Sequence, residues 1–179
     1  MKKILTILVA LMLVLTAVAA APAEQEAFTF RNGIVFGMSM DEVIAAETAR
    51  YHEIDNEHTH GPVSFVEVEY SHVKENNIRA DVEYLFVQDK LVAIRVNYET
   101  RDISYRQLKA DLTQKYGTAG RVDLTLLGNG IYAVDDDGYL EGNPEAFVYG
   151  NVMIVLELDE DDIDLTYIDL SADYIQQQP

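Results

Sequence analysis

The fold is decided by residues 80–98, which read ADVEYLFVQDKLVAIRVNY. Apolar side chains stand at every second position from 80 to 86 and again from 92 to 98, with a polar turn at 88–90 between them. Asp81, Glu83 and Arg95 fall among the alternate positions. The pattern predicts a β-hairpin with one buried and one solvated face, in which Tyr84 and Tyr98 line the core.

Similar patterns predict four further strands. Upstream, residues 66–70 alternate and carry Tyr70, which we also expect in the core. Downstream, three apolar runs are separated by a turn at 150–151 and by an acidic turn at 159–162. These runs are residues 147–149, 152–158 and 163–170. His52 to Pro62 and Gly128 to Pro144 are predicted to be loops.

Two helices can be predicted from their first residues. Ser39 and Glu42 have the spacing of a capping box, and the helix they begin should reach about Thr48. Ser104 has the same relation to Gln107. The helix that follows Ser104 has apolar residues at helical spacing and a glycine stop, namely Tyr105, Leu108, Leu112, Tyr116 and Gly117.

These elements predict an α+β fold, a mostly antiparallel sheet of about six strands with two short helices packed on one face. The helical segments align at a constant offset of 65 residues, from Ser39 with Ser104 to Tyr51 with Tyr116. This alignment favours a duplicated helix-plus-sheet unit with halves 28–100 and 101–170. Shared capping rules offer the alternative explanation of the match.

Residues 1–23 have the pattern of a secretory signal peptide. Lys2 and Lys3 precede an apolar run that continues to Ala21, and small residues then supply two cleavage motifs. The alternative is an uncleaved membrane anchor, for which the run is barely long enough. We expect residues 24–179 to form a single α+β domain that is secreted or otherwise extracytoplasmic, in the cell envelope, and off the membrane after cleavage.

Charge and cysteine content exclude several classes of function. The chain has 13 Lys and Arg, 31 Asp and Glu, a net charge of −18 and no cysteine. Disulfides, thiol nucleophiles and cysteine metal sites are therefore excluded. Residues 122–179 contain 14 acids and no Lys or Arg. Such a surface repels nucleic acid and anionic lipid, and it favours cations or a basic protein partner.

The opening of the predicted domain resembles a known group of exported bacterial domains. Gly37-Met38-Ser39 followed by Val43 is similar to the start of the SmpA/OmlA-like lipoproteins and the β-lactamase-inhibitory-protein-like domains. It also resembles uncharacterised secreted Gram-positive proteins, whose later Lys-Tyr-Gly is matched by Lys115-Tyr116-Gly117. The resemblance implies a helix-plus-antiparallel-sheet fold used for protein binding, without catalytic residues. The chain departs from the lipoproteins in having no cysteine at the mature N-terminus.

Two metal sites can be considered from the sequence. His58 and His60, with His52 and Glu57 nearby, could offer zinc ligands on one face of an extended segment. The acidic turns offer oxygen ligands for calcium, namely Asp135, Asp137, Asp159 and Asp161. For both groups of residues, the simpler interpretation is a solvated polar loop.

No recognisable catalytic or cofactor motif occurs in the sequence. The composition and the resemblance together favour a secreted, non-enzymatic binding module for an unknown protein partner, without a cofactor other than calcium. Two alternatives remain open at this stage. One is a calcium-dependent structural protein of the envelope, and the other is a hydrolase with an unrecognised carboxylate site.

The signal peptide predicts the mature N-terminus. Cleavage after Ala19 or Ala23 would leave a protein that begins at Ala20 or Glu24. Intact-mass measurement of protein recovered from outside the cytoplasm distinguishes the two sites. Recovery of only the full-length chain, in the membrane fraction, would show that the segment is an anchor.

Overall fold

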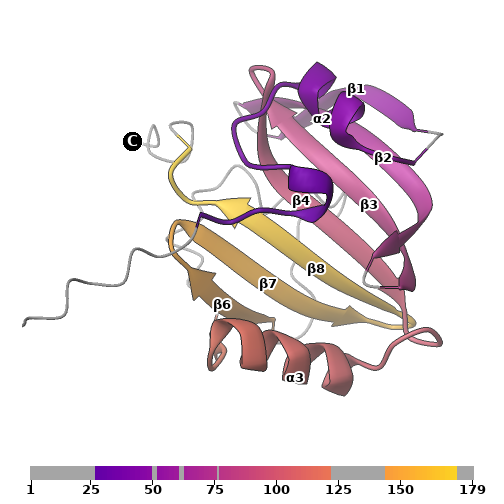
Figure 1. Ribbon diagram of the computed structural model, residues 1–179, viewed down its shortest axis with the longest axis vertical. Coiled ribbons are helices and arrows are strands. Elements are labelled where there is room, and N and C mark those ends of the chain that lie inside the picture. Colours follow the sequence, from indigo (N-terminus) through magenta and orange to yellow (C-terminus); the bar gives the residue numbers. More distant parts are fainter. Residues whose placement is uncertain (1–26, 50–51, 61–62, 76, 122–143, 173–179) are drawn as a thin grey trace, which may run out of the picture.

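The computed structural model describes residues 27–49, 52–60, 63–75, 77–121 and 144–172. A 3-10 turn, η1, opens this part of the chain and is followed by two α-helices and eight strands (Figure 1). In chain order the elements are η1 (Arg31–Gly33), α2 (Met40–Ala46), β1 (Glu53–His60), β2 (Val63–Glu75), β3 (Ile78–Val87), β4 (Lys90–Glu99), α3 (Tyr105–Tyr116), β5 (Gly120–Arg121), β6 (Glu145–Tyr149), β7 (Val152–Asp159) and β8 (Asp162–Asp169).

All eight described strands belong to one antiparallel sheet with the order β1-β2-β3-β4-β8-β7-β6-β5. Each half of the sheet is a run of four strands in which sequence neighbours pair. The halves meet where β4 pairs with β8, with Val96 opposite Leu165. The last strand of each run therefore lies at the centre of the sheet, with a helix preceding each run in the sequence.

The predicted hairpin forms β3 and β4. Gln88 and Asp89 take positive φ angles of 51° and 60°, as the two central residues of a tight hairpin turn require. The Asp89 carboxylate also accepts a hydrogen bond from the backbone N–H of Met40 (3.0 Å), which ties the turn to α2. Tyr84 and Tyr98 are buried as predicted, and so is Tyr70 on β2.

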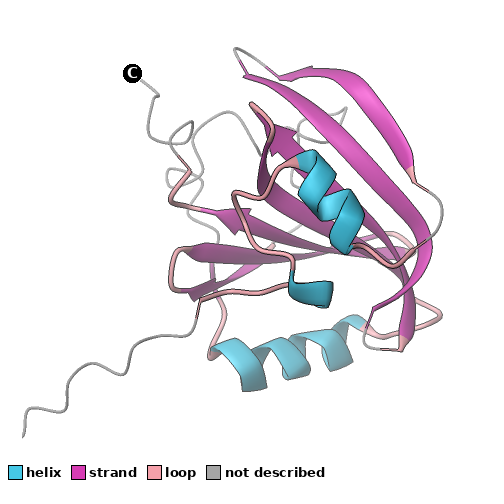
Figure 2. Ribbon diagram, turned by 45° about the horizontal axis from the view of Figure 1, so that its top comes forward, coloured by secondary structure: helices cyan, strands magenta, loops and turns pink. Residues whose placement is uncertain are grey.

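Both predicted helices are confirmed. Ser39 and Glu42 form the capping box, although α2 ends at Ala46, earlier than expected. The Ser104 hydroxyl accepts from the N–H of Gln107, and Gly117 ends α3 with a positive φ of 92°. Apolar side chains of both helices join the same core cluster. Figure 2 shows the two helices on the same face of the sheet.

The expectation of about six strands is corrected to eight. His52 to Pro62 was predicted to be a loop, but most of it forms β1, which pairs with β2. As the outermost strand, β1 pairs with only one neighbour, and its sequence is mostly polar. The alternation of apolar and polar residues that predicts a strand is therefore missing from it. The other missed strand, β5, has only two residues. Of the loop predicted from Gly128 to Pro144, residues 128–143 lie outside the described residues.

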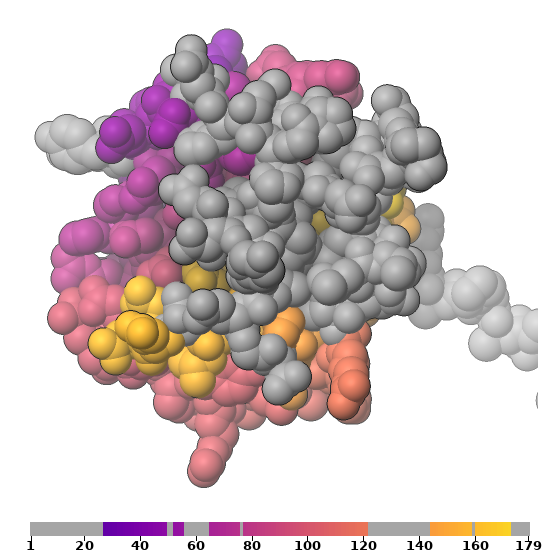
Figure 3. All heavy atoms as spheres, turned by 180° about the vertical axis from the view of Figure 1, so that it is seen from behind, coloured from indigo at the N-terminus to yellow at the C-terminus, as the bar shows by residue number. Residues whose placement is uncertain are grey.

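The acidic turn between β7 and β8 lies against the chain that leaves β4. The backbone carbonyl of Asp161 accepts hydrogen bonds from the N–H and the hydroxyl of Thr100, at 2.8 and 2.7 Å. Seen from behind, the yellow residues of this turn lie beside the pink residues that follow β4 (Figure 3). These hydrogen bonds connect the turn to the segment that follows β4, at one end of the central β4–β8 pair.

The carboxylate of Glu47 holds the N-terminal turn, α2 and the sheet together. Only 7% of Glu47 is exposed, the one buried charged residue of the described chain. The Tyr84 hydroxyl donates to its Oε2 (2.8 Å), and Asn32 Nδ2 donates to its Oε1 (3.0 Å). The N–H groups of Thr48 and Ala49 also donate to Oε1. Arg31 Nε completes the shell as an ion pair at 3.3 Å.

We predict that Glu47→Gln lowers the free energy of unfolding by about 3 kcal/mol, because it leaves the largely enclosed Arg31 guanidinium without its principal counter-charge. Urea denaturation measures the change. Glu53→Gln, the same substitution at an exposed position of β1, is the matched control. Equal losses in the two variants would show that the Glu47 charge has no special role.

Candidate functional site

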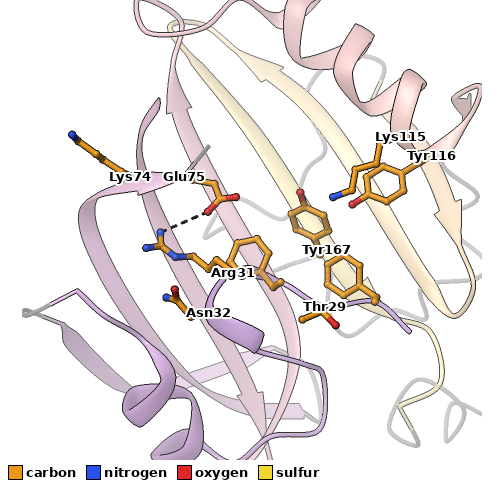
Figure 4. A pocket seen from close by; sticks show the side chains of 10 residues that line it. Thr29, Arg31, Asn32, Lys74, Glu75, Lys115, Tyr116 and Tyr167 are labelled. Atoms are coloured by element: carbon orange, nitrogen blue, oxygen red, sulfur yellow. Dashed lines mark ion pairs between the residues drawn. The ribbon is translucent and has the colours of Figure 1, made fainter. Parts of the chain in front are cut away.

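A pocket of about 400 Å³ opens between the N-terminal turn and the end of α3. The N-terminal segment, the end of β2, the end of α3 and one residue of β8 line it (Figure 4). We call it the Arg31 pocket, and its lining residues are Phe28, Thr29, Phe30, Arg31, Asn32, Lys74, Glu75, Lys115, Tyr116 and Tyr167. It brings together four parts of the chain that are far apart in the sequence.

Local backbone geometry positions Arg31. The N–H of Phe30 donates to the carbonyl of Ile34 (2.8 Å), which closes a tight loop around η1. Asn32 and Gly33 reverse the chain with φ angles of 56° and 80°, in the left-handed region that Asn and Gly tolerate best. The reversal sends the Arg31 side chain back between the buried Glu47 and the end of β2.

Positive charge predominates in the lining of the Arg31 pocket. Arg31, Lys74 and Lys115 are cations, and Glu75 is the single carboxylate among the lining residues that the structure describes. Arg31 Nη1 lies 3.7 Å from Glu75 Oε2. Burial raises the pKa of Glu75, an effect that the nearby charges of Arg31 and Lys115 oppose. In a chain with a net charge of −18, such a gathering of cations is a local reversal of sign.

The Arg31 guanidinium keeps unused hydrogen-bonding capacity. Its side chain is 14% exposed, and neither Nε nor Nη1 makes a hydrogen bond in the structure although both atoms are buried. The ion pairs with Glu47 and Glu75, at 3.3 and 3.7 Å, supply charge without a well-aligned donor–acceptor contact. Buried donors without acceptors are costly, so a further acceptor at this position would be stabilising.

Aromatic rings form the wall of the Arg31 pocket beside these charges. Tyr167 lies with its ring centroid 5.2 Å from that of Phe28 and 5.5 Å from that of Phe30. Across the pocket, Lys115 Nζ sits 4.8 Å from the centre of the Tyr116 ring. This cation–π contact keeps the ammonium group at the rim, and Figure 4 shows it directed toward Tyr167.

A second pocket, of about 440 Å³, adjoins the Arg31 pocket at Phe28, which lines both. We call it the Asn151 pocket. It is bounded by the N-terminal segment, the β6–β7 turn and the end of β8, with lining that includes Phe36, Tyr149, Val152 and Asp169. Tyr149 also makes an edge contact with Tyr116 of the Arg31 pocket (5.5 Å between centroids). A charged pocket and a more apolar one thus lie next to each other.

A third pocket, of about 520 Å³, lies between α2 and the β2–β3 part of the sheet. Its described lining combines apolar residues with Asp41 and Asp89 and contains no cation. Because Asp89 already accepts a hydrogen bond from the start of α2, this pocket has fewer available polar groups than the Arg31 pocket. The Arg31 pocket is therefore the stronger candidate site.

The structure places the metal candidates only in part. His58 and His60 lie on β1 opposite Phe65 and Val63, so the extended backbone that the zinc hypothesis requires is present, but their side chains are outside the described set. Asp135 and Asp137 lie outside the described residues, as does the side chain of Asp159. Within the described part of the chain, no group of three or more potential ligands gathers around a metal position.

Sequence reasoning missed the Arg31 pocket. Clusters of charged residues can be recognised in a sequence only where the residues are close along the chain. Arg31, Lys74 and Lys115 stand far apart in the sequence and meet only in the folded protein. Lys115 and Tyr116 did occur in the Lys-Tyr-Gly segment that carries part of the family resemblance, and this was the one available signal.

Comparison with known proteins identifies the family. The family model of the TP0088 domain matches residues 28–178, which is nearly the whole predicted mature chain. The chain therefore belongs to the TP0088 domain family. No curated protein and no solved structure matches it. The resemblance of its opening segment to the SmpA/OmlA-like and β-lactamase-inhibitory-protein-like domains remains a prediction.

A second group of charges lies on the middle strands of the sheet. Glu83 of β3 stands opposite Glu69 on β2 and Arg95 on β4. Arg95 Nη1 approaches Glu83 Oε2 at 3.2 Å. Burial is the main reason why the pKa of Glu83 rises to about 7; Glu67 and Glu69 add to the rise and Arg95 opposes it. The Glu83 side chain is 23% exposed.

We predict that Glu83 makes stability depend on pH. The folded protein holds a proton on Glu83 more tightly than the unfolded chain does, so its contribution is complete below the ordinary pKa of 4.5 and is lost as pH rises through about 7. Glu83→Gln should remove that loss. Its free energy of unfolding relative to the wild type should therefore rise between about pH 5 and about pH 8.

Urea denaturation at both pH values tests the Glu83 prediction. Glu160→Gln, in the exposed β7–β8 turn, is the control and should follow the wild type. Parallel pH profiles for Glu83→Gln and the wild type would contradict the assigned role of Glu83.

Proposed function

We propose that this member of the TP0088 domain family is a non-enzymatic binding module that works outside the cytoplasm. It engages a partner protein through the face that carries the Arg31 and Asn151 pockets. The observation that carries the proposal is the combination, in the Arg31 pocket, of three cations with buried and half-buried aromatic rings on a chain that is otherwise acidic. Arginine and tyrosine are enriched at the centres of protein interfaces.

The arrangement of Glu75 favours binding over hydrolysis. Hydrolysis by paired carboxylates needs two such groups about 5 to 10 Å apart across the substrate. Among the described residues that line the Arg31 pocket, Glu75 is the single carboxylate, and it is paired with Arg31. The groups that remain, two lysines and several aromatic rings, are suited to holding a ligand.

The signal-peptide pattern of residues 1–23 supports the proposed location outside the cytoplasm. Among the residues that the structure describes, no helix is long and apolar enough to cross a membrane. The large net negative charge adds to the proposal in a second way. It attracts a partner with a basic surface over a long range, while the pockets select the groups that dock at short range.

The proposed function predicts capture of a partner through the Arg31 pocket. The mature protein, immobilised at its C-terminus, is incubated with culture supernatant and envelope extract, and bound proteins are identified by mass spectrometry. Lys74→Glu combined with Lys115→Glu should abolish capture of that partner, because both exposed side chains line the pocket.

The matched control is Lys90→Glu combined with Arg106→Glu, which makes the same change of net charge at exposed positions outside the pocket. Thermal melting confirms that both double variants fold. A partner that is retained by the control variant and lost from the pocket variant supports the function. Equal capture by all three proteins would place the interface elsewhere and overturn the proposal.

A further inference from the structure

We propose that the Arg31 pocket receives a single carboxylate of the partner, and that the adjoining Asn151 pocket receives an apolar side chain next to it. The inference rests on the proposed function and names the chemistry of the partner segment. The ligand is thus a peptide in which an acidic group, either a side chain or a free C-terminus, stands beside an aromatic or aliphatic residue.

The cations of the Arg31 pocket are the reason for proposing a carboxylate in the ligand. Among the described residues, no carboxylate forms an ion pair with Lys115, and its ammonium group lies over the Tyr116 ring. The Arg31 guanidinium adds positive charge on the other side of the pocket, where its Nε and Nη1 are buried beside Glu47 and Glu75 (Figure 4). A carboxylate beside Lys115 would accept charge-assisted hydrogen bonds from the ammonium group, which are about twice as strong as neutral ones.

The aromatic rings at the junction of the two pockets are the reason for proposing an apolar side chain beside the ligand carboxylate. Phe28 lines both pockets and is half-buried, with its ring stacked on Phe36 at 5.4 Å. Tyr149 and Val152 continue this wall beyond Phe28. An apolar side chain placed there would cover rings that water now reaches, while its neighbouring carboxylate lies on the charged side of Phe28.

The net charge of the chain limits the ligand to few negative groups. A protein of net charge −18 repels a polyanion such as a nucleic acid or an anionic membrane surface before it reaches the pocket. A single carboxylate on a neutral or basic segment meets no such barrier. The volume of about 400 Å³ also suits one or two side chains better than a polymer.

Doubly capped dipeptides test the inference. N-acetyl-Phe-Glu-amide is titrated into isotopically labelled mature protein, and the shifts of the backbone NMR signals give the affinity. We expect shifts at Arg31, Lys115 and Phe28, and at least about tenfold weaker binding of the isosteric N-acetyl-Phe-Gln-amide. N-acetyl-Ala-Glu-amide, which lacks the ring, should also bind less tightly.

Protein variants assign the contact. Lys115→Met should weaken the Phe-Glu probe about tenfold, whereas Lys90→Met, at an exposed position outside the pocket, should leave the affinity unchanged. N-acetylphenylalanine with a free carboxylate, compared with its amide, separates the two sources of the carboxylate. Tighter binding of the free acid assigns C-terminal recognition, and tighter binding of Phe-Glu assigns side-chain recognition; either result supports the inference.

Equal binding of the Phe-Glu and Phe-Gln probes together with equal binding of N-acetylphenylalanine and its amide would overturn the inference, as would preference for N-acetyl-Phe-Lys-amide. The outcome is separable from that of the proposed function. If the Lys74→Glu and Lys115→Glu double variant loses the captured partner while no carboxylate probe binds, the proposed function is retained and the carboxylate ligand is rejected. If the probes bind but no partner depends on the pocket, the ligand chemistry stands and the protein partner does not.

Discussion

One buried carboxylate carries the arrangement on which the candidate site depends. Glu47 follows α2 and lies beneath the N-terminal turn, where it accepts hydrogen bonds from Tyr84 on the sheet and from Asn32 on the turn. Removing such a charge from water costs several kcal/mol, which only a complete set of donors and a counter-charge can offset. Because Arg31 supplies that counter-charge, the position of Arg31 is fixed by the core.

The geometry of the Arg31 pocket is therefore a consequence of the contacts that satisfy the buried Glu47 carboxylate. The Arg31 guanidinium reaches inward to Glu47 and outward to Glu75, so the same side chain belongs to the buried network and to the pocket. Tyr167 has a similar double role, since it is buried in the core cluster yet lines the pocket between Phe28 and Phe30. A binding site built on such residues is preorganised, which lowers the entropic cost of holding a ligand.

The charges of this protein act on two length scales. The net charge of −18 acts over roughly a Debye length, about 8 Å at physiological ionic strength, and governs which molecules approach. Within the Arg31 pocket, the sign is set by Arg31, Lys74 and Lys115 at contact distance. Long-range attraction of a basic partner and short-range binding of its carboxylate are compatible, because desolvated contacts are screened much less than surface charges.

The sequence by itself determined the local structure. The alternation at residues 80–98 specified the β3–β4 hairpin, and the serine caps specified where α2 and α3 begin, since these features depend on neighbours within a few residues. The tertiary structure decided what has no local signature. The polar strand β1 forms because β2 offers it a partner, and Glu47 is buried because Tyr84, Asn32 and Arg31 converge on it. The Arg31 pocket likewise joins residues from four separate segments, a proximity that no spacing along the chain encodes.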